Sequence, residues 1–451
     1  MLEYGTHFHQ ERNHQGLGNV LIMPDASSKG RGGLVIRRAR LGGLLNYYAR
    51  AAAQWSAEFW NITGCMKNDR KPLTFTRGIV AMAAGLAAGI AALPASAVPN
   101  YTATPLATLG GTYNYGGAIN ASGHVTGYAN TAGDTASHAV VYSAGSVADL
   151  GTLGGATSVG KGINDSGQVA GYSYTTSNGN AHAFLYSDGS MRDLGSLGGG
   201  PTYGFGINAS GHVTGVSDNG SLTHQRAFLY SGGTMHDLGT LGGSQSWGYA
   251  INANEQVTGS ANVAGDTATH PFIYSGGTMT DLGTLGGSIG EGMGINASGQ
   301  ITGYAYTPRN AARHAFLSSG GRVRDLGTLG GTDSTGLAIN ASGQITGWAY
   351  TTNNSTAAAF LYSGGTMYDL NSLVVSGLSN DAYLTEAVAI NDSGQIVAND
   401  CPHPRCHAYR LDPVASAVPA TSVPTLSSWA LGATGLLLLT GAFLRRRWIK
   451  R

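Results

Sequence analysis

The heptapeptide DLGTLGG occupies residues 149–155 and returns unchanged at 237–243, 281–287 and 325–331, with DLGSLGG at 193–199. The dipeptide Ile-Asn follows the same repeat: it begins at residues 119, 163, 207, 251, 295 and 339, always 44 apart, and again at residue 390. Repetition with a period of this length is typical of solenoids, propellers and related arrays. The chain therefore contains seven related units.

Each unit divides into four short strands at its turn signals. In the sixth unit, a strand of small residues from Gly336 to Asn340 leads into Asn340-Ala341-Ser342-Gly343, a pattern that predicts a type I turn closing a hairpin. A second strand follows at Gln344 to Tyr350. The third and fourth strands are exemplified by Ala183 to Tyr186 and Met235 to Leu238, with a glycine turn between them. Four antiparallel strands in 44 residues predict one blade of a β-propeller.

The two ends of the repeat region complete one another. The last unit ends after its third strand, at His407 to Leu411. The repeat region begins with an additional strand, Thr104 to Leu109, which resembles the fourth strand of a unit but precedes the first unit. Sharing one blade between the two ends removes an exposed sheet edge. We therefore predict an all-β, seven-bladed β-propeller of 44-residue repeats, closed by the N-terminal strand. A β-solenoid is the alternative, but it gives no reason for ends that match.

The segment before the propeller carries a targeting signal. Residues 66–97 combine a basic start, an apolar stretch and Ala95-Ser96-Ala97, which predicts the helix and cleavage site of a secretory signal peptide; a buried apolar helix is the alternative. Residues 1–65 would place that signal inside the chain, so we interpret them as a non-native or disordered extension before the true start at Met66. The other expected segments are the propeller at 98–412, a linker at 413–422 and a C-terminal signal at 423–451.

The C-terminal signal contains sixteen mostly apolar residues, Trp429 to Leu444, followed by the basic end RRRWIKR. This pattern predicts a transmembrane helix whose basic end stays in the cytoplasm. The opening tetrapeptide, Val423 to Leu426, and Trp429 resemble the IPTL variant of the C-terminal sorting signals that exosortase-like transpeptidases process in Gram-negative bacteria. The resemblance implies an exosortase-like sorting enzyme as a partner and a destination at the cell surface. A plain membrane anchor is the alternative.

A second resemblance covers every unit. The triplet His-Ala-Phe occurs at His182 and His314, with variants at His138, His270 and His407, beside DLGTLGG and the Ile-Asn-x-Ser-Gly turn. These motifs resemble those of the HAF family of extracellular repeat proteins over about 310 residues, which implies export and a surface role without established chemistry. Because each unit contributes one such histidine around a ring, we assign them to the fold and not to a metal site.

Charge and motifs exclude several classes of function. Residues 98–422 carry 9 Lys and Arg against 19 Asp and Glu. Such a surface repels phosphate, so we predict no nucleic-acid partner. No nucleophile elbow, P-loop or dinucleotide fingerprint stands in a fitting context, so we predict no cofactor. Asn-Ala-Ser triplets match the glycosylation sequon but are assigned to the turn, and they begin at Asn120, Asn208, Asn296 and Asn340.

The last unit contains the cysteine pair of the exported chain, Cys401 and Cys406. In an oxidising compartment we expect them to form a disulfide that stiffens a loop near the closing seam. A zinc site that adds His403 and His407 is the alternative. Its spacing matches no common zinc pattern, so we predict no metal.

Differences between the units indicate a candidate binding site. The variable loops and blade connections are expected on one face of the disc, where binding residues concentrate. Aromatic rings stack on sugars and carboxylates accept hydrogen bonds from hydroxyls, so such residues near the starts of the first strands predict a carbohydrate ligand. Packing between blades is the alternative reason for these residues. The candidate rim consists of Tyr115, Lys161, Tyr203, Trp247, Glu291 and Glu386.

These observations predict an exported, Gram-negative type surface protein that acts as a binding or matrix module for carbohydrate or another envelope component. A carbohydrate-active lyase or hydrolase and a purely structural surface protein are the alternatives. Glycoside hydrolysis uses two carboxyls about 5 to 9 Å apart. Glu291 and Glu386 lie on different blades, so we predict no enzymatic activity.

Overall fold

The computed structural model describes residues 35–40, 45–50, 98–220, 224–401 and 406–414. The chain divides into two units, Met1–Ala92 and Leu93–Arg451. In the first unit, β1 (Val35–Arg40) pairs antiparallel with β2 (Leu45–Arg50). The expected signal peptide and C-terminal helix lie outside the described residues. Within the described ranges, no helix is long and apolar enough to cross a membrane.

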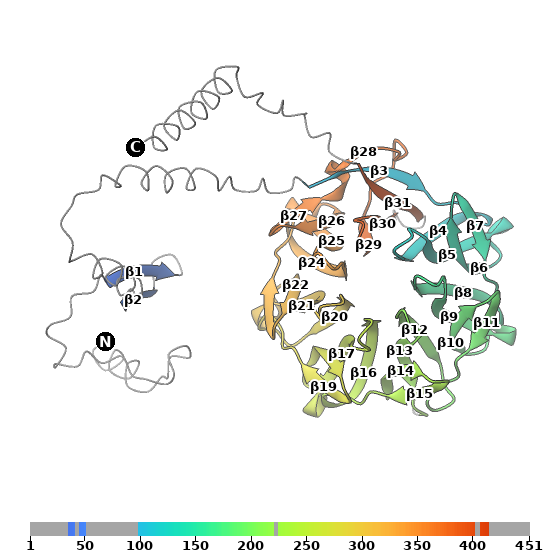
Figure 1. The fold of residues 1–451 in the computed structure, drawn as a ribbon, viewed down its shortest axis with the longest axis horizontal. Coiled ribbons are helices and arrows are strands. Elements are labelled where there is room, and N and C mark those ends of the chain that lie inside the picture. Colours follow the sequence, from blue (N-terminus) through green and yellow to red (C-terminus); the bar gives the residue numbers. More distant parts are fainter. Residues whose placement is uncertain (1–34, 41–44, 51–97, 221–223, 402–405, 415–451) are drawn as a thin grey trace, which may run out of the picture. The chain divides into compact units, whose positions relative to one another are not determined.

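The second unit is a β-propeller-like ring of repeated four-stranded antiparallel blades (Figure 1). Blade 1 contains β4 (Gly110–Ile119), β5 (Val125–Thr131), β6 (Ser137–Ser143) and β7 (Ser146–Asp149), and blade 2 contains β8 (Gly154–Ile163), β9 (Val169–Thr175), β10 (Ala181–Ser187) and β11 (Ser190–Asp193). Blade 3 contains β12 (Thr202–Ile207), β13 (Val213–Asp218), β14 (Gln225–Ser231) and β15 (Thr234–Asp237), and blade 4 contains β16 (Gly242–Ile251), β17 (Val257–Val263), β18 (Thr269–Ser275) and β19 (Thr278–Asp281).

The ring continues with three more blades. Blade 5 contains β20 (Gly290–Ile295), β21 (Ile301–Tyr306), β22 (Arg313–Ser319) and β23 (Arg322–Asp325), and blade 6 contains β24 (Gly330–Ile339), β25 (Ile345–Thr351), β26 (Ala357–Ser363) and β27 (Thr366–Asp369). Blade 7 contains β29 (Glu386–Ile390), β30 (Ile396–Asp400), β31 (His407–Val414) and β3 (Asn100–Pro105). Single 3₁₀ turns follow several strands: η2 (Ala132–Asp134), η3 (Thr176–Asn178), η4 (Ala264–Asp266), η5 (Pro308–Asn310), η6 (Thr352–Asn354) and η7 (Leu370–Ser372).

The predicted closure of the ring is found in the strand pairing. β3 pairs antiparallel with β31, from Asn100 opposite Val414 to Pro105 opposite Tyr409. The closing strand begins and ends earlier than the predicted Thr104 to Leu109, because its pairing with β31 runs from Asn100 to Pro105. Beyond its end, the side chain of Asn114 donates to the carbonyl groups of residues 106 and 107. A short strand that the sequence did not reveal, β28 (Val374–Ser376), pairs parallel with the outer side of β3. We call the junction of blades 7 and 1 the closure seam.

The repeated turns have the predicted chemistry. In the first hairpin of blade 6, the Gly343 N–H donates to the Asn340 carbonyl at 3.0 Å, and Gly343 has φ of +76°. That combination is a type I turn followed by a left-handed residue, which is a common hairpin loop. The turn therefore needs a left-handed residue at this position, which is glycine in six blades and Glu255, with φ of +59°, in blade 4.

The apolar core lies between neighbouring blades. Phe272 of β18 is completely buried and packs with Ala227 and Leu238 of blade 3 and with Val257 of its own blade. Burial of such a side chain contributes roughly 1.5–3 kcal/mol. Blades 1 and 7 have Val140 and Tyr409 at this position. In blades 2, 3, 5 and 6 the equivalent residues are also completely buried phenylalanines: Phe184, Phe228, Phe316 and Phe360.

The repeated asparagines also join the blades into a closed ring of hydrogen bonds. Each side-chain amide donates to the backbone carbonyl of the equivalent asparagine in the next blade, at 3.0 to 3.3 Å. The ring closes across the seam, where Asn391 donates to Asn120 at 3.0 Å. All members are buried, so the Asn-Ala-Ser triplets serve the fold. The ring runs through Asn120, Asn164, Asn208, Asn252, Asn296, Asn340 and Asn391.

Candidate binding site on the inner strands

The predicted rim residues lie on the first strands, which form the inner edge of the ring (Figure 1). In blades 1, 2, 4 and 6 these strands begin several residues before the predicted start, so Tyr115 lies in mid-strand and not at a strand end. On each first strand that carries a predicted residue, the position next to that residue is occupied by a small buried residue. A Cβ on Gly160 would lie 2.2 Å from Oγ1 of Thr126 in the preceding blade. The larger side chains at the predicted positions, such as Tyr115 and Lys161, are partly exposed.

Three of the predicted residues come together at the closure seam. Tyr115 of β4 stacks on Tyr128 of β5, with ring centroids 5.6 Å apart. The Lys161 ammonium of β8 lies 5.9 Å from the centroid of the Tyr115 ring. Glu386 of β29 accepts hydrogen bonds from Tyr115 and from Asn399 of β30. We call these five residues the seam cluster.

Burial determines the electrostatics of the seam cluster. It raises the pKa of Glu386, although the hydrogen bonds from Tyr115 and Asn399 and the charge of Lys161 oppose the shift. Burial also lowers the pKa of Lys161, which the Glu386 charge opposes. The pKa of Tyr115 is raised by burial and then by Glu386, so its hydroxyl remains a donor at neutral pH. The cluster can therefore offer both hydrogen-bond acceptors and donors beside an aromatic surface.

A second cluster surrounds the other predicted carboxyl. Glu291 of β20 accepts hydrogen bonds from Tyr304 of β21 and Tyr249 of β16. The guanidinium of Arg313 in β22 lies 5.1 Å from the Tyr304 ring centroid and 4.5 Å from that of Trp348 in β25. These distances are within the range of cation–π interactions. We call these five residues the blade-5 cluster.

Burial again has the largest effect on ionisation in the blade-5 cluster. It raises the pKa of Glu291, against the hydrogen bonds from Tyr304 and Tyr249 and the charge of Arg313. It also raises the pKa of Tyr304 and Tyr249, and the Glu291 carboxylate adds to both shifts. A tyrosine held in its neutral form is a donor and not a nucleophile. The hydroxyls of Tyr304 and Tyr249 can therefore donate hydrogen bonds at neutral pH.

The remaining predicted residues belong to neither cluster. The Trp247 indole Nε1 donates to Gln225 Oε1 at 2.8 Å. The ring of Tyr203 meets that of Tyr172 edge-on, with centroids 5.1 Å apart. The sequence reasoning missed the aromatic residues of the second strands, although each follows a repeated glycine and varies between units. These residues are Tyr128, Tyr172, Tyr304 and Trp348.

The two carboxyls do not form a pair. Glu291 and Glu386 belong to clusters on different blades, and neither contributes to the pKa shift of the other. No group of three His, Cys, Asp or Glu that could hold a metal ion occurs in the part of the chain that the structure describes. Cys401 and Cys406 form a disulfide, which leaves no thiolate for the alternative zinc site.

The repeated histidines bind within their own blades. In four of them the Nδ1 atom lies 2.7 to 2.8 Å from the aspartate carboxylate that ends the neighbouring outer strand. That aspartate is the first residue of DLGTLGG or, at Asp193, of DLGSLGG. The histidine and the heptapeptide of one blade are therefore joined by this contact. The pairs are His138 with Asp149, His182 with Asp193, His270 with Asp281, and His314 with Asp325.

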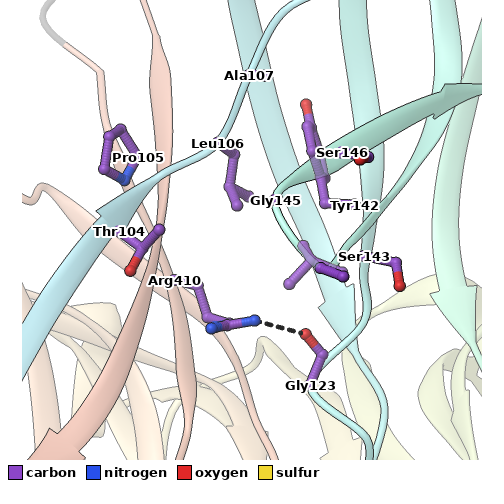
Figure 2. Close-up of a pocket in the computed structure, with 12 residues that line it drawn as sticks. Thr104, Pro105, Leu106, Ala107, Gly123, Tyr142, Ser143, Gly145, Ser146 and Arg410 are labelled. Carbon is purple, nitrogen blue, oxygen red and sulfur yellow. Dashed lines mark hydrogen bonds between the residues drawn. The ribbon is translucent and has the colours of Figure 1, made fainter.

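A small cavity opens at the closure seam (Figure 2). Arg410 crosses it, donating to the Gly123 carbonyl at 3.3 Å and pairing with Asp412 at 3.1 Å. Thr104 and Tyr142 line its two sides. Its volume of about 90 Å³ is small beside the roughly 300–1,000 Å³ of ligand pockets. We therefore place the candidate site on the inner strands and not in this cavity.

Comparisons with known proteins concern the fold alone. No family model matches the chain, and no curated protein matches it. The β-propeller domain of the Trilobed protease from Pyrococcus furiosus is 9% identical, with a TM-score of 0.45 over 66% of this chain and 96% of that one. An oligogalacturonate lyase in complex with manganese is 12% identical, with a TM-score of 0.39 over 70% and 91%.

TolB from Acinetobacter baumannii is also similar, at 10% identity and a TM-score of 0.38. The match covers 54% of this chain and 62% of TolB, less than two thirds of that protein. At these identities and scores the similarities assign no activity to this chain. The class of protein is therefore defined by its strand pairing, which is that of a propeller-like fold of repeated four-stranded blades.

Proposed function

We propose that this protein is an exported, surface-sorted binding or matrix module whose inner strands bind carbohydrate. Export is supported by the signal-peptide pattern at residues 66–97 and by the resemblance of residues 423–451 to IPTL sorting signals. The resemblance of the repeats to the HAF family supports the same location. A partner of the C-terminal segment would be an exosortase-like enzyme, with the membrane as its site of action.

One observation carries the binding proposal: aromatic rings lie beside hydrogen-bonding groups on the partly exposed inner strands. Tyr115 lies beside Glu386, and Tyr304 lies beside Glu291 and Arg313. Rings with adjacent acceptors and donors match the alternating apolar faces and hydroxyl edges of sugars. A need for packing alone would be met by aliphatic residues, such as Leu337 of β24 at the position of Tyr249.

Catalysis is a weaker proposal. The lyase or hydrolase hypothesis needs an acid and a base placed around one bond. The two carboxyls of the inner strands are instead each surrounded by their own tyrosine and cation. A purely structural surface protein is the outcome that the binding test below would favour if it failed.

A glycan array with the purified full-length chain tests the proposal. We expect selective binding of a hydroxyl-rich polysaccharide and a loss of about tenfold or more in affinity for Trp247→Ala, because stacking area is removed. Tyr368→Ala is the matched control, because Tyr368 lies on the outermost strand of its blade and should leave binding unchanged. An array without any bound glycan would refute the proposed function.

A further inference from the structure

Aromatic pairs lie along one arc of the inner strands, within blade 1, between blades 2 and 3 and between blades 3 and 4. The pair Tyr115 and Tyr128 lies within blade 1. Tyr172 of blade 2 contacts Tyr203 of blade 3 with centroids 5.1 Å apart. Phe205 of blade 3 contacts Tyr249 of blade 4 at 5.6 Å. Blades 1 to 4 therefore present a run of aromatic side chains, and all of them are partly exposed.

A carboxyl stands at each end of this aromatic arc. At one end Glu386 accepts a hydrogen bond from Tyr115, the first aromatic residue of the arc. At the other end Glu291 accepts a hydrogen bond from Tyr249, the last one. Each carboxyl is balanced by a cation that lies over an aromatic ring, Lys161 or Arg313. The two clusters described above thus lie at the two ends of this arc.

The other blades break this pattern on their first strands. The first strands of blades 5, 6 and 7 contain no aromatic residue. Blades 1, 3 and 4 have Tyr115, Tyr203 and Tyr249 on theirs, whereas in blade 2 the aromatic residue of the arc, Tyr172, lies on the second strand. The seven blades share the ring of turn asparagines, and blades 5 to 7 form without aromatic residues on their first strands, so the fold does not require aromatic residues here. The asymmetry therefore points to a ligand that occupies one side of the ring.

We propose that the arc on blades 1 to 4 binds a single linear polysaccharide, whose sugar rings stack on successive aromatic side chains between Glu386 and Glu291. This inference rests on the proposed function and adds the shape of its ligand. Each carboxylate has four lone-pair sites, so acceptors remain for sugar hydroxyls beside the protein donors. The excess of acidic residues in 98–422, 19 against 9, favours a neutral chain over a polyanion.

An extended site makes affinity depend on chain length. Once one sugar is bound, its linked neighbours reach the next ring at high effective concentration. We expect affinity for the full-length protein to rise by about tenfold or more between a disaccharide and a hexasaccharide and then to level off when the arc is filled. A site for one sugar unit would give the same affinity at every length.

Isothermal titration with oligosaccharides of two to eight units tests the arc. The probes are β-1,4-, β-1,3- and α-1,4-linked glucans, together with a series of the linkage that the glycan array selects. Glu386→Gln and Glu291→Gln should each weaken the hexasaccharide by about tenfold, because each removes a charge-assisted hydrogen bond at one end. Tyr203→Ala, in the middle, should weaken it as well. Met293→Leu, an inner-strand change outside the arc, is the control.

The outcomes distinguish a failure of the proposed carbohydrate binding from a failure of the extended arc. If the array shows no bound glycan, the proposed function itself falls, and the arc falls with it. If glycans bind but affinity does not depend on length, or if only one end variant has an effect, the arc is refuted while carbohydrate binding stands. Circular dichroism of each variant shows whether a loss of affinity comes from a loss of fold.

Discussion

The closed asparagine ring predicts that one asparagine contributes to stability both in its own turn and across a blade boundary. In blade 4 the Asn252 amide donates to the Asn296 carbonyl at 3.0 Å and to Gln256 Oε1 at 2.8 Å. Its oxygen accepts from the backbone N–H groups of Asn254 and Gln256, both at 3.0 Å. Asn252→Ala removes all four contacts at a site that is only 5% exposed.

The size of the effect follows from these four contacts. At about 1 kcal/mol for each hydrogen bond, Asn252→Ala should lower the free energy of unfolding by about 3–4 kcal/mol. Asn252→Asp retains the oxygen that closes the turn and loses the two donated hydrogen bonds, one of which links the blades. It should therefore lower the free energy of unfolding by about 2 kcal/mol. The neighbouring Asn254 is exposed and donates one bond of 3.2 Å to Ala297. Asn254→Ala should therefore cost less than about 1 kcal/mol.

Thermal and urea unfolding measure these differences. With a shift of about 2 °C for each kcal/mol in a domain of this size, Asn252→Ala should melt about 6–8 °C below the wild type and Asn254→Ala within about 2 °C of it. Asn252→Asp should lie between them. If Asn252→Ala and Asn254→Ala melt together, the ring of asparagines does not hold the blades, and the hydrogen bonds between blades add nothing to stability.

Three further changes test the seam and the site. Tyr101 of β3 is fully buried and its hydroxyl has no partner among the described residues, so Tyr101→Phe should raise the free energy of unfolding by about 1 kcal/mol and Tyr101→Ala should lower it by about 3–5 kcal/mol in urea unfolding. Replacing both Cys401 and Cys406 by serine should cost about 2 kcal/mol, because the disulfide closes a short loop, and an unchanged melting temperature would contradict this. Burial raises the pKa of the Glu291 carboxyl in the folded protein above its ordinary value of 4.5. The free energy of unfolding of the wild type therefore falls as the pH rises from 4.5 through this raised pKa. Glu291→Gln removes this loss, and its urea midpoint should therefore gain on that of the wild type between pH 4 and pH 7; a constant difference would show that the carboxyl is not desolvated.

The fold could be predicted from the sequence because its determinants are local and repeated. The Asn-x-x-Gly turn marks a strand end in six of the seven units, glycine-rich connections mark most of the others, and the unmatched strands at the two ends imply closure. The boundaries of the closing strand were wrong because they are set by its pairing with β31, from Asn100 opposite Val414 to Pro105 opposite Tyr409. A pairing between the two ends of the repeat region leaves no local pattern in the sequence.

The candidate site was predictable only in part. Variation at the first strand found Tyr115, Lys161 and Glu386, and these meet at the closure seam. The partners on the second strands, such as Tyr304, were missed, since the reasoning followed one strand of each blade. Which residues meet depends on blade twist and on the register between strands, and periodicity alone does not set either of them.

Closure of the ring and assembly of the seam cluster are one event. Glu386 comes from the last blade and Tyr115 from the first, and they meet because β3 pairs with β31 and Asn391 bonds to Asn120. A ligand that contacts both residues binds only the closed ring, and it therefore stabilises that ring by RT ln(1 + [L]/Kd). At a concentration of 100 times Kd, this amounts to about 2.7 kcal/mol. Saturating glycan should thus slow hydrogen exchange in β3 more than in β15 of blade 3, because only β3 is part of the closure.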